Sequence, residues 1–161
     1  MSEQTSRPLD TPGDYATAVI DLLNTARQSV EIFSPDLNPV VFGSSDLIAA
    51  VRSFVTRNKH STMRVLIRDT GPLTRDDHRF LAVAQRISSK IIVRKLATDF
   101  YSRDDAFVIA DDTQYALRKQ ASSWAGLYDQ TRPEVARQRL TAFEEMWAHS
   151  VPDPGIRRLH I

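Results

Sequence analysis

Apolar residues recur at two different spacings along the chain, and segments of the two kinds alternate. A spacing of three or four residues, typical of one buried helix face, predicts helices over 14–26, 44–55, 74–87 and 133–147. Shorter runs, most of them rich in β-branched residues, predict strands over 29–34, 62–69, 90–96, 106–111 and 113–118. The predicted order is therefore α-β-α-β-α-β-β-β-α.

This order is typical of an α/β domain. Strands that alternate with helices of this length imply crossover connections and parallel pairing, so we expect a mostly parallel central sheet with helices on both faces. The last two strands are close enough to form an antiparallel hairpin that turns at Asp111 and Asp112, although two adjacent carboxylates could instead be a catalytic pair. The domain should span residues 14–150, after a flexible leader (1–13) and before a C-terminal tail (151–161).

Polar residues that can begin a helix stand before the predicted helices. Asp14 is the candidate cap of the first helix, and Ser44 or Ser45 that of the second. Thr74 with Asp77 three residues later resembles a capping box at the start of the third helix. Pro133 is well placed in the first turn of the last helix.

Composition narrows the class of protein. The 161 residues, 42% of them hydrophobic and 25% charged, are typical of one globular domain and exclude a disordered, coiled-coil or fibrous chain. The absence of cysteine excludes disulfides, thiolate metal sites and a cysteine nucleophile. No apolar run approaches the roughly 20 residues of a membrane span, so we expect no membrane association and a cytoplasmic location.

Charge is distributed unevenly although the formal net charge is only +1. Residues 57–95 contain ten Lys and Arg against three Asp and Glu. This segment could form an electropositive face for phosphate-rich ligands. It could equally be a solvated rim of helices and strands whose cations pair with the acidic flanking segments.

Four segments resemble one half-unit of the phospholipase D-like superfamily: ARQSVEIFSPDL, MRVLIRD, KIIVRKL and AFVIADDTQYALR. HRFLAVAQRISSKIIVRKL and the ending DPGIRRLHI are similar to an uncharacterised bacterial branch that lacks the superfamily's His-x-Lys-x4-Asp motif. The resemblance covers residues 14–150 and implies a phospholipase D-like half-unit that ends in a hairpin and a helix.

The resemblance also implies that the usual chemistry is missing. In active members a histidine attacks phosphorus, a lysine neutralises phosphate charge, and a second histidine protonates the leaving group. Aligning FVIAD with the motif strand places Asp104 at the histidine, Ala106 at the lysine and Asp111 at the aspartate. Arg118 and Lys119 replace a glycine–serine pair. A phosphodiesterase of the usual mechanism is therefore not expected, because a carboxylate repels phosphate.

Ligands of open α/β sheets bind where strand carboxyl ends and helix starts meet. We therefore expect Ser34 and Arg68 to converge with Arg118 on one side of the sheet. Cations there would hold phosphate oxygens, and a tryptophan would supply a stacking wall. The candidate ligand-binding residues are Arg68, Asp69, Arg75, His78, Arg79, Arg118, Lys119, Ser122 and Trp124.

His78 is the histidine to consider for residual catalysis, because it lies near a predicted helix start beside Arg75 and Arg79. The alternative is a surface or half-buried histidine beside Asp77. No set of His, Asp and Glu has metal-ligand spacing and no phosphate-binding glycine-rich loop is present, so no metal and no cofactor are expected.

Three functions are compatible with these features. The first is a catalytically inactive domain that binds phosphate-bearing ligands, of which nucleic acid is one candidate, in a basic cleft. The second is a protein-interaction or regulatory subunit, since the resembling branch can occur beside acetyltransferase-type domains. The third is a divergent phosphodiesterase that uses His78.

A homodimer is expected because phospholipase D-like enzymes need two half-units and this chain provides one. The candidate anchors of its interface are Trp124, Leu127 and Tyr128. The alternative is a monomer in which these side chains pack on the domain's own core.

Overall fold

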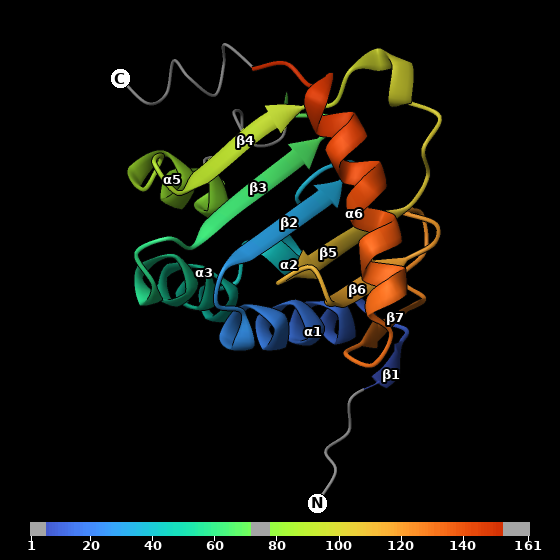
Figure 1. The fold of residues 1–161 in the computed structure, drawn as a ribbon, viewed down its shortest axis with the longest axis horizontal. Helices are drawn as coiled ribbons and strands as arrows, with labels where there is room; N and C mark the ends of the chain where they lie inside the picture. The colour runs from blue at the N-terminus through green and yellow to red at the C-terminus, as the bar shows by residue number, and fades with distance from the viewer. Residues whose placement is uncertain (1–5, 72–77, 153–161) are drawn as a thin grey trace, which may run out of the picture.

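The computed structural model describes residues 6–71 and 78–152, which fold into one sheet with helices on both faces (Figure 1). The strands are β1 (Ser6–Leu9), β2 (Ser29–Ser34), β3 (Thr62–Ile67), β4 (Ile91–Lys95), β5 (Ala106–Ala110), β6 (Gln114–Arg118) and β7 (Gly126–Asp129). The helices are α1 (Pro12–Thr25), α2 (Pro39–Phe42), α3 (Ser45–Arg57), α5 (Arg79–Arg86), α6 (Pro133–Ala148) and the 3-10 turn η1 (Thr98–Phe100).

The sheet is mixed, with strand order β1-β7-β6-β5-β2-β3-β4. Among the described strands, only β2, β3 and β4 pair in parallel, and every other neighbouring pair is antiparallel. The predicted α/β class and the β5–β6 hairpin are confirmed, whereas the expectation of a mostly parallel sheet is wrong. The β5–β6 hairpin pairs antiparallel with β2 through β5. Strands β7 and β1, which the sequence pattern does not predict, extend this antiparallel half of the sheet.

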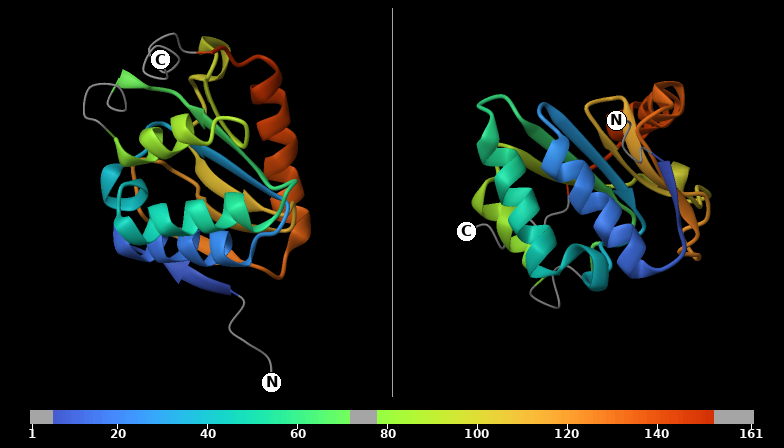
Figure 2. Two further views of the ribbon diagram at one scale, coloured as in Figure 1. Left: turned by 90° about the vertical axis from the view of Figure 1, so that its left-hand side faces the viewer. Right: turned by 90° about the horizontal axis from the view of Figure 1, so that it is seen from below.

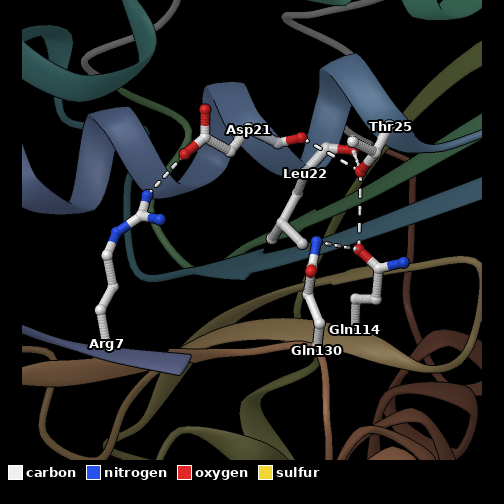
Figure 3. A network of polar contacts seen from close by, with 6 residues as sticks. All are labelled: Arg7, Asp21, Leu22, Thr25, Gln114 and Gln130. Atoms are coloured by element: carbon white, nitrogen blue, oxygen red, sulfur yellow. Dashed lines mark hydrogen bonds and ion pairs between the residues drawn. The ribbon is translucent and has the colours of Figure 1, made fainter. Parts of the chain in front are cut away.

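Strand β1 lies within the segment that was expected to be a flexible leader. Ser6–Leu9 pairs antiparallel with β7, and the side chain of Leu9 is buried. The guanidinium of Arg7 forms an ion pair of 2.6 Å with Asp21 on α1 (Figure 3). It also lies 4.3 Å from the ring centre of Tyr128. The four residues of β1, which include Pro8, show no clear alternation of apolar and polar side chains, so the sequence pattern does not predict this strand. Proline is compatible with its place at the edge of the sheet.

A polar network ties the end of α1 to the antiparallel half of the sheet (Figure 3). The hydroxyl of Thr25 donates to the main-chain oxygen of Asp21 at 3.1 Å and lies 3.5 Å from the side-chain oxygen of Gln114. The amide of Gln130, just after β7, donates to the same oxygen of Gln114 at 3.0 Å. These contacts fix the hairpin relative to α1.

Helix α1 begins two residues earlier than the sequence pattern indicates. Its N-cap is Thr11, whose hydroxyl accepts a hydrogen bond of 3.0 Å from the main-chain N–H of Asp14. The carboxylate of Asp14 accepts in return from the N–H groups of Asp10 and Thr11, and these bonds lower its pKa. Asp14 is therefore the third residue of a capping box and not the cap itself.

Two apolar cores lie on opposite faces of the sheet. Val30 and Ile32 of β2 point toward α1, α2, α3 and α5, and Phe33 points toward α6. Figure 2 shows these two helical layers on either side of the sheet. The apolar stripe predicted for α6 is confirmed, since Phe143 and Met146 are buried and Trp147 is partly buried. Among the described residues, no helix is long and apolar enough to cross a membrane.

Candidate ligand-binding cleft

A cleft of about 260 Å³ opens at the carboxyl ends of β2 and β3. These strands are parallel, so their ends meet at one edge, and the antiparallel β5 begins at that same edge. The pairing of Ala106 with Arg118 brings the end of β6 to it as well. The cleft is lined by Phe33, Pro35, Arg68, Leu96, Arg103, Asp104, Asp105, Ala121 and Ser122.

Two arginines of the cleft are held against aromatic rings. Arg68 donates to the main-chain oxygen of Tyr101 at 2.9 Å, and its guanidinium carbon lies 5.2 Å from the ring centre of Tyr101. The guanidinium carbon of Arg103 lies 6.0 Å from the ring centre of Phe33. Both cations are therefore positioned by their neighbours while they line a cleft that is open to solvent.

A buried carboxylate orients the second of these arginines. Asp105 is only 8% exposed and accepts two hydrogen bonds from Arg103, at 3.1 and 2.7 Å. Its Oδ2 also accepts from Arg139 of α6 at 2.8 Å. One carboxylate therefore serves two guanidinium groups, which leaves positive charge beside the cleft. The neighbouring Asp104 is exposed and adds a negative charge at the rim.

Arg118 shares this edge of the sheet with Ser34 and Arg68, as expected, but its side chain lies outside the cleft. Its guanidinium donates to the main-chain oxygens of Ser123, at 2.9 Å, and Ala121. It also stacks 3.9 Å from the ring centre of Trp124, and its burial lowers its pKa. Arg118 therefore holds the loop between β6 and β7 in place.

His78 has a structural position. It is the N-cap of α5 and is 6% exposed. Its Nδ1 accepts from the main-chain N–H of Phe80 at 3.1 Å, and its Nε2 lies 2.7 Å from the carbonyl oxygen of Leu37, to which it must donate. Both ring nitrogens are engaged and neither faces the cleft. This geometry gives no support to the hypothesis of residual catalysis by His78.

The other candidates are dispersed. Ser122 lines the cleft, and Lys119 is exposed on the same loop. Asp69 is positioned by its carboxylate, which accepts from the N–H of Gly71 at 3.0 Å. Arg79 is exposed and reaches the main-chain oxygen of Gly43 at 3.4 Å, between α2 and α3. Arg75, Thr74 and Asp77 lie outside the described residues.

The described cations of segment 57–95 do not form one face. Arg57 donates to the main-chain oxygens of Leu23 and Ala26 at the end of α1, and Lys90 donates to those of Val55 and Asn58 at the end of α3. Such cations stabilise helix C-termini. Others lie on the α6 face or in the cleft. The expected pairing of cations with the acidic flanking segments is seen for Arg64, which forms ion pairs with Glu31 and Glu144, whereas Arg57 and Lys90 bind main-chain oxygens.

Asp111 carries a carboxylate with a structural role in the β5–β6 turn. Asp111 and Asp112 have φ of 52° and 64°, which is the geometry of a tight hairpin turn. The carboxylate of Asp111 accepts from three successive main-chain N–H groups between α1 and β2: those of Arg27, Gln28 and Ser29. The hairpin interpretation is confirmed, and the pair is not a catalytic dyad.

The proposed dimer anchors pack on the domain's own core. Tyr128 is 3% exposed, and Trp124 packs against the core around α1. Leu127 packs against the core under α6. This arrangement is the one expected of the monomer alternative, and the homodimer stays a prediction.

A family model described as a domain of unknown function (DUF7931) matches residues 11–159. The chain belongs to this family. No curated protein sequence matches the chain. The match begins at the N-cap of α1 and continues past α6, so it includes every residue that lines the cleft.

Solved structures similar to this DUF7931 member include a phospholipase D family member. Nuc of Salmonella typhimurium, a phospholipase D family member, has a TM-score of 0.69 at 14% identity, over 92% of this chain and 97% of its own. NucT of Helicobacter pylori has a TM-score of 0.64 at 14% identity, over 92% and 98%. TrmBL2, an archaeal chromatin protein with a novel mode of DNA binding, has a TM-score of 0.69 at 12% identity, over 95% and 56%. These similarities confirm the phospholipase D-like fold.

Proposed function

We propose that this domain binds a phosphate-bearing ligand in the cleft at the carboxyl edge of the sheet and does not hydrolyse it. The observation that carries the proposal is the pair of guanidinium groups, Arg68 and Arg103, that line one cleft of about 260 Å³. Planar guanidinium groups suit phosphate oxygens, and both are held by neighbouring groups before a ligand arrives.

The absence of hydrolysis is inferred from the two residues that the resemblance aligns with the motif histidine and lysine, and from His78. Asp104 supplies a carboxylate that would repel a phosphate, and Ala106 is a buried methyl group in β5. His78 caps α5 through Nδ1 and binds the carbonyl oxygen of Leu37 through Nε2. None of these three side chains supplies the histidine nucleophile or the lysine cation that the usual mechanism of the superfamily needs.

Nucleic acid is the phosphate-bearing ligand that we favour. The partly exposed ring of Tyr101 lies beside Arg68, and such a combination suits a base next to a backbone phosphate. The DNA-binding chromatin protein of the same fold gives independent support.

Binding of a fluorescent oligonucleotide across a salt series tests the proposal. The affinity should fall as salt rises, because a bound phosphate releases counterions. Arg68→Ala should weaken binding by about tenfold and reduce the salt slope by about one. Arg52→Ala, which removes an exposed arginine of α3, is the matched control and should bind like the unmodified protein. A flat salt dependence, or equal losses in both variants, would contradict the proposal.

A protein partner is the second candidate, and β4, the strand at one edge of the sheet, favours it (Figure 1). Ile92 is 43% exposed there, and the guanidinium carbon of Arg94 lies 5.7 Å from the ring centre of Trp147. If this edge strand binds a partner, Ile92→Asp should abolish the complex and leave oligonucleotide binding unchanged. Loss of oligonucleotide binding in Ile92→Asp would count against a separate protein-binding site.

A further inference from the structure

A glutamate lies buried between the sheet and α6. Glu31 of β2 is 3% exposed and points to the α6 face, on the same side as Phe33. Its Oε2 lies 3.3 Å from Nη2 of Arg64 on β3. Its Oε1 has no hydrogen-bond partner among the residues that the structure describes. A buried, unpartnered carboxylate oxygen is costly, and the cost is larger when the group is ionised.

The cation that faces Glu31 is shared with α6. Arg64 donates to both carboxylate oxygens of Glu144 on α6, at 2.8 and 2.7 Å, which are shorter contacts than its contact with Glu31. Its guanidinium also lies 5.1 Å from the ring centre of Phe143 and 5.4 Å from that of Trp147. Arg64 therefore fastens α6 to the sheet, and Glu31 competes for it.

The charges around Glu31 disfavour its ionisation. Burial is the main cause that raises the pKa of Glu31, to about 7, and the negative charges of Asp112 and Glu144 raise it further. Arg64 opposes these effects. The carboxyl is therefore largely protonated below neutral pH and largely ionised above it.

We infer that Glu31 makes the docking of α6 on the sheet dependent on pH: the helix is held most firmly when Glu31 is protonated and detaches more often when Glu31 is ionised. Ionisation of Glu31 places a second negative carboxylate, next to that of Glu144, on the guanidinium of Arg64. Detachment of α6 relieves this conflict because water reaches both carboxylates. The same motion withdraws Arg139 from Asp105, so it also changes the charge beside the cleft.

The size of the effect follows from linkage. In the detached state the pKa of Glu31 returns toward its ordinary value of 4.5, whereas in the docked state it is about 7. The docked state therefore binds the proton more tightly, and the detachment equilibrium rises as pH rises. Between about pH 6 and about pH 8.5 the predicted increase in detachment is about tenfold.

Amide hydrogen exchange of α6, corrected for the intrinsic pH dependence of exchange, tests this inference. Residues 133–148 should show about tenfold faster corrected exchange at about pH 8.5 than at about pH 6, whereas α3 on the opposite face should not. Glu31→Gln should abolish the difference. Glu145→Gln, which removes an exposed carboxylate of α6, is the matched control and should retain it.

Three results would overturn the inference. The first is equal corrected exchange of α6 at the two pH values in the unmodified protein. The second is an equal increase in α3, which would mean that Glu31 acts on the whole domain. The third is an unchanged pH effect in Glu31→Gln. All of these measurements are made without a ligand, so they are independent of the proposed function.

Discussion

Removal of the Asp111 carboxylate should destabilise the domain, because this group anchors the hairpin turn. This carboxylate accepts hydrogen bonds of 3.0, 2.8 and 3.2 Å from the N–H groups of Arg27, Gln28 and Ser29. It therefore fixes the β5–β6 turn to the segment between α1 and β2. Asp111→Gly removes the carboxylate and keeps the backbone free to adopt the φ of 52°.

The expected loss can be worked from these contacts. Hydrogen bonds to a charged group contribute about 1.5 to 3 kcal/mol each, but the released N–H groups of this exposed loop regain bonds to water. We therefore expect Asp111→Gly to lower the free energy of unfolding by about 3 kcal/mol. Asp111→Ala should cost about 1 kcal/mol more, because a Cβ disfavours this left-handed backbone.

Urea denaturation of the variants measures both differences. Asp112→Gly is the matched control, since Asp112 has a φ of 64° and an exposed side chain, and it should be neutral or slightly stabilising. If Asp111→Gly stays within about 0.5 kcal/mol of the unmodified protein, the carboxylate does not anchor the hairpin.

Three further predictions concern the cleft, the loop and the assembly. Asp104→Asn should tighten oligonucleotide binding by severalfold, because it removes the negative charge at the cleft rim; weaker binding would contradict the proposed site. Gly126→Ala should lower the melting temperature markedly, since the added Cβ would lie very close to the main-chain oxygen of Leu117, and an unchanged value would show that β6 and β7 can separate there. Light scattering should give twice the 18.2 kDa of the chain if it forms a homodimer, and a mass near 18.2 kDa would show a monomer.

Much of the fold was predictable because apolar periodicity reports burial directly. The predicted strand over 29–34 matches β2, and Pro133 begins α6 as expected. Strand β1 was missed because its four residues gain their stability by pairing with β7, far away in the sequence. The sequence pattern predicts Asp14 as the N-cap of α1, whereas the structure shows that the cap is Thr11. Both residues of a capping box are polar, and only their geometry shows which of them is the cap.

The cleft was less predictable than the fold. Arg68 was expected there because it follows a parallel strand. Arg103 and Asp105 were missed because their roles depend on each other and on Arg139, which comes from α6. Arg118 was expected to contact ligand, yet it caps main-chain oxygens of its own loop. The sequence shows which cationic residues are present, but the tertiary structure decides which of them already bind main-chain or carboxylate oxygens.

The most direct test of the central claim is an NMR titration of the protein with a short oligonucleotide, with phosphorus spectra of the same samples recorded over time. The proposed function predicts that the main amide shifts map to residues at the cleft, including Arg68, Arg103, Asp105 and Ser122, and that the phosphodiester signals stay intact. Shifts confined to other surfaces would contradict the proposed site. New phosphomonoester signals that require the protein would contradict the proposed lack of hydrolysis.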